Sequence, residues 1–185
     1  MPRRFFIFLW GILAIFVCNS CDKSPMEQTK KAKGILPLSI RNSWTFHSTD
    51  GIIQTTYRIT GKQKLSNGID VFIFDKEFIF KKNAFYESNG ALFGLNMSNP
   101  DSTLAFIFPD GVKVGDQWKI LNNEALLKVE AVDDKVITPA GTFTCVRTVD
   151  LAISNKSYVW WAYGVGVVKV GTYNKFQQLF SYQFK

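Results

Sequence analysis

The sequence is poor in the residues that cross-link a fold or build a metal site. It has three cysteines and one histidine among 185 residues. Cys18 and Cys21 lie at the end of an apolar leader, so Cys145 has no partner in the rest of the chain and no disulfide is expected there. His47 is a lone histidine, which is more often a surface residue than a metal ligand. The sequence therefore predicts a domain held together by its apolar core, with no metal and no cofactor.

Clustered positive charge is also missing, although the formal net charge is +7. Six of the 22 basic residues precede Gly34, and residues 34–185 carry 16 basic and 13 acidic residues. The longest basic run in that stretch is the pair Lys81-Lys82. Binding to a phosphate backbone needs Lys and Arg clustered along one face, so we expect no nucleic-acid partner.

The only long apolar run is Phe5–Val17, which follows the basic pair Arg3-Arg4. A transmembrane helix needs roughly 20 apolar residues, and this run of 13 is too short to span a bilayer. A basic start followed by a short apolar run is typical of a cleaved secretory signal peptide. The leader therefore predicts export.

The four residues after this run, Cys-Asn-Ser-Cys, resemble a bacterial lipobox, in which the second cysteine is acylated and the chain is cut just before it. We predict a signal peptide over residues 1–20, cleavage between Ser20 and Cys21, and a lipid on Cys21. Residues 21–34 are polar and rich in lysine, which predicts a flexible tether. The protein is expected in the bacterial cell envelope, held to a membrane by its N-terminal lipid.

Residues 35–185 predict a single all-β domain. Apolar residues alternate with polar ones over Ile53–Ile59, the pattern of a strand with one buried face. Turn signals recur every eight to twelve residues or so, and no window combines helical periodicity with a cap. These signals are Thr49-Asp50-Gly51, Ser66-Asn67-Gly68, Ser88-Asn89-Gly90, Pro109-Asp110-Gly111 and Pro139-Ala140-Gly141. About a dozen hairpin-linked strands must close or cover their edges, which predicts an antiparallel barrel, half-barrel or two-sheet sandwich.

Three further local expectations follow from the pattern. Bulky side chains for one face of a curved sheet come from Phe72, Phe74, Phe78, Phe80, Phe85 and Phe93. The acidic pair Asp133-Asp134 is expected in a hairpin turn. The segments 38–46 and 112–120 resemble each other around Trp44 and Trp118, which indicates either a recurring hairpin with a Trp beside its turn or a duplicated half-domain.

Three segments carry a resemblance to known proteins. They are the opening Leu36-Pro37-Leu38 with Asn42 and Trp44 (LPL-x-x-x-N-x-W), the segment TPAGTF over 138–143 and the segment GVGVVK over 164–169. Together they resemble a family of exported all-β proteins of unknown function found among bacterial lipoproteins. The resemblance implies a shared fold, and it assigns no catalytic residue. Arg41 stands where these proteins commonly have glycine.

The candidate binding surface consists of Tyr158, Trp160, Trp161 and Tyr163. Adjacent strand residues point to opposite faces, so one of the two tryptophans is expected in the core. The other either faces the exterior or a cleft, or is covered by a second layer. An exposed tryptophan beside tyrosines would suit a sugar ring, a peptide or a partner protein.

No set of residues specifies a reaction. The sequence has neither a G-x-S-x-G elbow nor an H-E-x-x-H helix, and Cys145 alternates with apolar neighbours as a buried structural thiol does. Gly164-Val165-Gly166 is expected to be a turn rather than a phosphate loop. We expect a non-enzymatic envelope lipoprotein that binds a partner or an apolar ligand or serves structurally, the partner being an envelope protein, a peptide or a glycan. The alternative is an envelope hydrolase with a site built from scattered Asp, Glu and Tyr.

Overall fold

The computed structural model describes residues 34–98, 103–120, 125–172 and 174–185. The predicted signal peptide, Cys21 and the tether up to residue 33 lie outside these residues. Within them, no helix is long and apolar enough to cross a membrane.

The described residues form one antiparallel sheet of twelve strands, which confirms the all-β prediction. The strands are β1 (Ser43–Ser48), β2 (Gln54–Lys64), β3 (Asp70–Phe74), β4 (Ala84–Ser88), β5 (Ala91–Leu95), β6 (Ala105–Phe108), β7 (Gln117–Ile120), β8 (Ala125–Thr138), β9 (Gly141–Asp150), β10 (Ser157–Ala162), β11 (Gly166–Gly171) and β12 (Phe176–Gln183). Each strand pairs with its neighbour in sequence, except that β6 does not pair with β7, and β1 pairs with β12. The chain is therefore two six-stranded meanders joined between β1 and β12.

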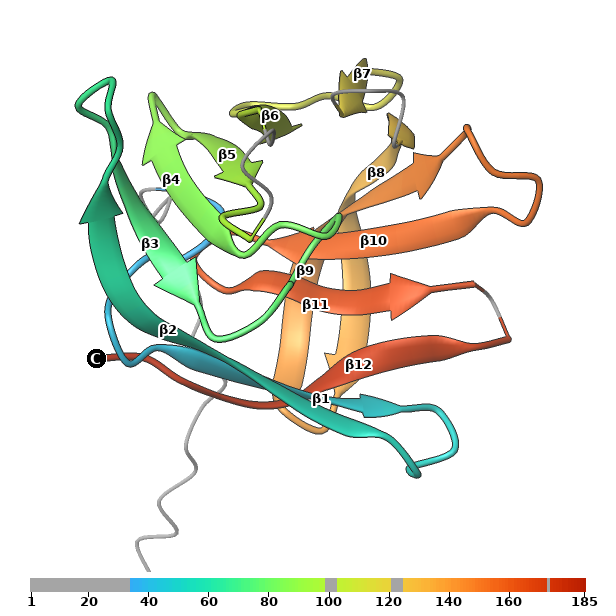
Figure 1. Cartoon of the computed structure of the whole chain (residues 1–185). Helices are drawn as coiled ribbons and strands as arrows, with labels where there is room; N and C mark the ends of the chain where they lie inside the picture. The colour runs from blue at the N-terminus through green and yellow to red at the C-terminus, as the bar shows by residue number, and fades with distance from the viewer. Residues whose placement is uncertain (1–33, 99–102, 121–124, 173) are drawn as a thin grey trace, which may run out of the picture.

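The sheet curls until its two edge strands, β6 and β7, come together, so the fold is a nearly closed barrel (Figure 1). The indole N–H of Trp118 on β7 donates to the carbonyl of Ile107 on β6 at 3.0 Å. The rings of Trp118 and Phe108 meet edge to face with centroids 5.7 Å apart. Among the described residues, side chains rather than ladder pairs join this seam.

The predicted turn signals do mark turns. Asn89 and Gly90 join β4 to β5 with φ of 50° and 78°, the positive values that a two-residue type I′ hairpin turn requires. Arg41 also has a positive φ, 77°, and its amide donates to the carbonyl of Ile59. This explains why glycine suits position 41, since a side chain in the left-handed region is strained. Gly164 and Val165 lie in the turn between β10 and β11, as expected, and Gly166 begins β11.

Two expectations about local structure are wrong. Asp133 and Asp134 lie inside β8 rather than in a turn, at a place where the pairing with β9 shifts register. The carboxylate of Asp134 accepts from Arg147 on β9 at 2.9 Å, so a cross-strand partner offsets its charge. The six phenylalanines also do not share one face. Phe93 lies on the outer face, where its ring stacks on Tyr86 with centroids 4.9 Å apart.

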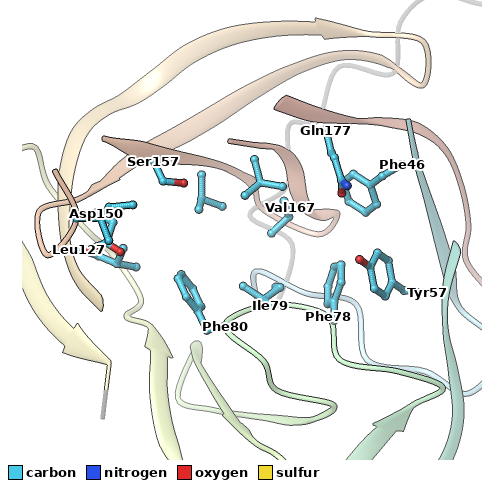
Figure 2. Close-up of a pocket in the computed structure, with 13 residues that line it drawn as sticks. Phe46, Tyr57, Phe78, Ile79, Phe80, Leu127, Asp150, Ser157, Val167 and Gln177 are labelled. Atoms are coloured by element: carbon cyan, nitrogen blue, oxygen red, sulfur yellow. The ribbon is translucent and has the colours of Figure 1, made fainter. Parts of the chain in front are cut away.

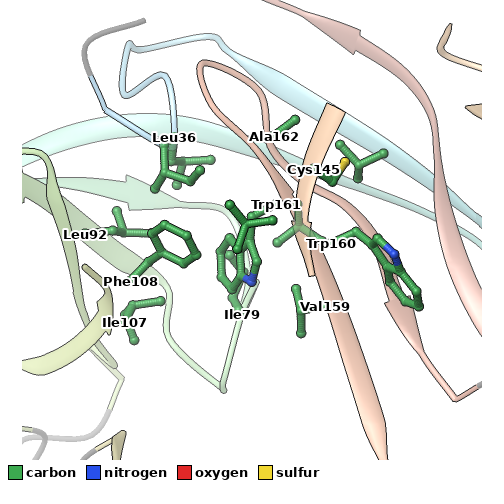
Figure 3. Packing of buried hydrophobic residues seen from close by; sticks show 14 of the residues in the cluster. Leu36, Ile79, Leu92, Ile107, Phe108, Cys145, Val159, Trp160, Trp161 and Ala162 are labelled. Carbon is green, nitrogen blue, oxygen red and sulfur yellow. The ribbon is translucent and has the colours of Figure 1, made fainter. Parts of the chain in front are cut away.

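One end of the barrel interior is filled by large apolar side chains (Figure 3). Trp44, Phe85, Phe108 and Trp161 are all fully buried there. The indole N–H of Trp44 donates to the carbonyl of Val165 at 2.7 Å, within the buried core. A small second cluster around Val71, Ala84 and Leu95 lies on the other side of the sheet.

Two of the three segments that carry the resemblance contribute to this packing, the opening segment and the segment 164–169. Asn42 donates its side-chain amide to the carbonyl of Pro37 at 2.7 Å, and its side-chain oxygen accepts from the amide of Lys185. A Cβ on Gly166 would lie 2.6 Å from the Leu36 side chain, so glycine permits this close approach. The opening segment, the β10–β11 turn and the C-terminus therefore meet at one end of the barrel.

Candidate functional site

The other part of the barrel interior is hollow and contains a cavity of about 300 Å³ (Figure 2). Most of its wall is apolar. The lining side chains are Phe46, Tyr57, Phe78, Ile79, Phe80, Leu127, Asp150, Ile153, Ser157, Val159, Val167, Val170 and Gln177. They come from strands and loops far apart in the sequence, which the barrel brings together.

Strand alternation builds one wall of the cavity. Val159 on β10 lies opposite Val170 on β11, and Val170 lies opposite Gln177 on β12. Residues directly opposite in neighbouring strands share a face of the sheet, so these three side chains all point inward. Ile153, in the loop after β9, is 44% exposed and marks where the cavity meets solvent.

The facing wall is the loop between β3 and β4. Its residues Phe78, Ile79 and Phe80 lie along one side of the cavity in Figure 2. The prediction that Phe78 and Phe80 belong to the strands of the sheet is wrong, because they sit in this loop, which folds into the barrel. The ring of Phe78 packs on Phe74 and Tyr57, with centroids 5.1 and 4.8 Å away. Aromatic contacts therefore hold the loop in place.

The tip of this loop is a strained turn. Phe80 and Lys81 have φ of 49° and 54°, and Ile79 bridges Lys82 across them. Left-handed backbone costs a side-chain-bearing residue about 1–2 kcal/mol. Such conformations persist when the surrounding structure fixes them, and they concentrate at functional sites. Here the strain accompanies the insertion of three consecutive apolar side chains into the barrel.

Polar groups in the cavity wall are few. Asp150 is the only carboxylate among the described lining residues, and its Oδ1 accepts from the amides of Leu126 and Ala152 at 3.1 and 2.8 Å. Asp150 is thus engaged in holding the β9–β10 loop. Hydrolysis of a glycoside would need two carboxyl groups facing each other across the cleft, which these lining residues do not supply.

The candidate aromatic surface is buried. Tyr158, Trp160 and Trp161 are 3%, 6% and 0% exposed, and Tyr163 is half-buried. The two tryptophans point to opposite faces, as alternation predicts, but both are covered, so the alternative with one exposed tryptophan does not hold. The four side chains do not form one surface, because Trp161 and Tyr163 pack around Phe108 while Trp160 packs on Tyr158.

A polar cluster covers Trp160 on the outer face. Its indole N–H donates to Asp134 Oδ2 at 2.9 Å, the same oxygen that accepts from Arg147. The ammonium of Lys169 lies 4.8 Å from the Trp160 ring centroid and 3.7 Å from that of Phe176. Burial lowers the pKa of Lys169, and the nearby Asp134 opposes that shift. We interpret this cluster as a structural one, in which polar side chains of the β8–β9 hairpin and Lys169 cover Trp160 on the outer face.

Cys145 and His47 lie outside the cavity wall. Cys145 is fully buried, which confirms the expected structural position, and burial together with the Asp134 charge raises its pKa to about 12. The thiol therefore stays protonated at neutral pH and is a poor nucleophile. His47 stacks on Phe180 with ring centroids 3.9 Å apart. The described residues hold no group of three or more His, Cys, Asp or Glu placed to bind a metal.

Comparison with known proteins finds one family model and two solved structures. Residues 127–184 match the model of the DUF3108-like family. Two solved structures are similar to this chain. One is a candidate lipoprotein from Parabacteroides distasonis, 14% identical with a TM-score of 0.46. The other is a candidate exported protein with a YmcC-like fold from Bacteroides fragilis, 16% identical with a TM-score of 0.47. Each likeness covers 83% of this chain and 100% of the other. The sequence matches no curated protein.

Proposed function

We propose that this protein is a lipoprotein of the bacterial cell envelope, anchored through an acylated Cys21, whose barrel binds an apolar ligand without catalysing a reaction. The leader sequence supports the anchor. The observation that supports binding is the cavity, whose volume of about 300 Å³ lies at the lower end of the range usual for small-molecule sites. Larger barrels enclose ligand cavities or channels in their interior.

Ligand binding in such a cavity would be driven by removal of apolar surface from water. Each buried methylene contributes about 0.8 kcal/mol, and the aromatic wall offers Phe46, Phe78 and Phe80 as contact partners. Among the lining residues that the structure describes there is no pair of carboxylates, which glycoside hydrolysis would need. Binding is therefore the role that the geometry supports best.

An apolar carbene precursor, trifluoromethyl-phenyldiazirine, tests binding in the cavity. We expect photolysis with the mature protein in lipid nanodiscs to label peptides that carry Ile79 and Val167, because both side chains line the cavity. Val159→Phe fills the cavity from its wall and should remove this labelling. Val132→Phe is the matched control, since Val132 is 41% exposed and outside the cavity wall.

Thermal unfolding of both variants checks that the barrel still folds. Val170→Phe, at a half-buried position of the same wall, replaces Val159→Phe if that variant unfolds. Equal labelling of the cavity peptides in wild type and in a folded cavity-filled variant would refute the proposal.

The anchor is tested by growth with a labelled fatty acid. We expect Cys21→Ala to lose the label and to leave the membrane fraction, whereas Cys145→Ser should keep both, because Cys145 is buried in the barrel. Label retained by Cys21→Ala would show that the lipid is elsewhere and would contradict the proposed anchor.

A further inference from the structure

We infer that the ligand of the barrel cavity is a single acyl chain with an uncharged head group. The inference rests on the proposed function, since it specifies what the same cavity binds. Three observations carry it: the volume of the cavity, its elongated shape between two walls, and the kinds of polar group that line it.

Volume limits the ligand to one chain. A methylene group is similar in size to a water molecule, whose share of liquid volume is about 30 Å³, so a cavity of about 300 Å³ holds roughly ten methylenes. A membrane phospholipid has two chains, and one of them already fills this volume. The second chain would find no room in the barrel and would remain in water, where it opposes binding.

Shape favours an extended chain over a compact ring system. In Figure 2 the lining side chains flank an elongated space that runs from Leu127 and Asp150 at one end to Phe46 and Gln177 at the other. The inserted residues Phe78, Ile79 and Phe80 form one long side, and the inward residues of β10 and β11 form the other. A flexible acyl chain fits such a slot because it contacts both walls along its length.

The turn at Phe80 and Lys81 ends the run of side chains that forms one long side of this slot. Both residues have positive φ, and Phe78, Ile79 and Phe80, which lead into the turn, all line the cavity. The Phe80 ring then rests 6.5 Å from Trp161, centroid to centroid, at the packed end of the interior. The loop that carries this turn therefore forms one of the two walls that bound the cavity (Figure 2).

Lining polarity selects the head group. Among the described lining residues there is no Lys, Arg or His, and Asp150 is the one charged group. A fatty-acid carboxylate would find no cation to offset the loss of its hydration and would be repelled by Asp150. An alkylammonium would find only Asp150, whose Oδ1 already accepts two backbone hydrogen bonds, so it would recover little of the hydration that it loses. Ser157, toward the Asp150 end, and Gln177, at the opposite end, instead offer a hydroxyl and an amide group, and either one can hydrogen-bond to a hydroxyl or an ester (Figure 2). A monoacylglycerol combines one chain with such a head.

Four photoreactive probes with the same diazirine-bearing acyl chain test the inference: a monoacylglycerol, a free fatty acid, an alkylammonium and a phosphatidylglycerol. Each is added to the mature protein in nanodiscs, and labelled peptides are mapped by mass spectrometry. We expect the monoacylglycerol to label the peptides of Ile79 and Val167 at least about tenfold more than the other three, a factor that corresponds to about 1.4 kcal/mol. Unlabelled monoacylglycerol should compete, and Val159→Phe should remove the labelling.

Two substitutions at neighbouring residues, one facing the cavity and one facing away, test head-group recognition. Gln177 faces the cavity, whereas the next residue, Gln178, lies on the opposite face of β12, opposite Lys169. Gln177→Leu should narrow the preference for monoacylglycerol over the fatty acid, and Gln178→Leu should leave it unchanged. Equal effects of the two substitutions would overturn the role assigned to Gln177.

The outcomes separate the inference from the proposal beneath it. Suppose that the phenyldiazirine labels the cavity, and that the fatty acid, the alkylammonium or the two-chain lipid labels it to the same extent as the monoacylglycerol. Binding in the cavity then stands, and the inference about the head group and chain number is refuted. The inference also falls alone if the phenyldiazirine labels the cavity and no acyl probe does. If neither the phenyldiazirine nor any acyl probe labels the cavity, both fall.

Discussion

The two tryptophans that begin the two meanders make a matched test of how the barrel is held together. Both donate an indole N–H to a backbone carbonyl, Trp44 to Val165 and Trp118 to Ile107. The first bond is fully buried, and the second is partly buried at the seam between β6 and β7. Phenylalanine lacks the N–H donor, and we expect replacement by it to lower the free energy of unfolding by different amounts at the two positions.

Trp44→Phe should lower the free energy of unfolding by roughly 2–4 kcal/mol. A buried carbonyl left without a donor costs about 1–3 kcal/mol, and the smaller ring leaves a void beside Phe74 and Phe184, whose centroids each lie 5.5 Å away. Trp118→Phe should cost about 1 kcal/mol or less, because Trp118 is half-buried and its replacement by a shorter side chain would let water take the place of the lost donor. The free energy of unfolding should therefore depend more on the Trp44 side chain than on the Trp118 side chain.

Urea unfolding followed by far-ultraviolet circular dichroism measures both costs. The midpoint should fall much further for Trp44→Phe, with the slope of free energy against urea unchanged in both variants. Equal midpoints for the two variants, or a loss below about 1 kcal/mol for Trp44→Phe, would refute the reasoning that burial decides the cost.

Three further predictions concern single residues. Iodoacetamide at pH 8 should alkylate Cys145 rapidly in urea and hardly at all in the folded protein, because the thiol is fully buried and burial raises its pKa to about 12; comparable rates would contradict its placement. Arg41→Gly should raise the free energy of unfolding by about 0.5–1 kcal/mol, since relief of left-handed strain exceeds the entropy cost of glycine. A lower urea midpoint would argue against that strain. Burial raises the pKa of Glu87 above 4.5, opposed by hydrogen bonds from the amides of Leu36 and Ile35. Its contribution to stability is therefore present below pH 4.5 and is lost as the pH rises through the raised value. Glu87→Gln should flatten this fall in unfolding free energy with pH, and an unchanged pH profile would count against it.

The strand framework could be predicted from the sequence because its signals are local. The alternation around Tyr57 and the Asn89-Gly90 turn specify a strand and a hairpin whatever the rest of the chain does. The prediction of a turn at Asp133-Asp134 was wrong, because two neighbouring carboxylates indicate a turn only when no basic side chain pairs with them. That partner, Arg147, comes from the next strand through a register that the sequence does not reveal.

The cavity could not be predicted. Its walls join residues such as Phe46 and Val159 that are brought together only by the curl of the sheet. The inserted loop gave a weak signal, because Phe78-Ile79-Phe80 is a short apolar run followed by Lys81-Lys82, and no Gly or Asn marks its turn. The pair Trp160-Trp161 gave a strong signal that proved to be packing, since both side chains are buried and their indole N–H groups donate to Asp134 and Thr148.

Methyl NMR spectroscopy of the mature protein in nanodiscs, titrated with a monoacylglycerol, tests whether the barrel interior takes an acyl chain. We predict saturable shifts of the Ile79, Val159 and Val167 methyl signals, which line the cavity, while Val71 in the second cluster stays unchanged. Shifts confined to Ile52, which is 81% exposed, or no shifts at all, would show that the chain stays outside the barrel.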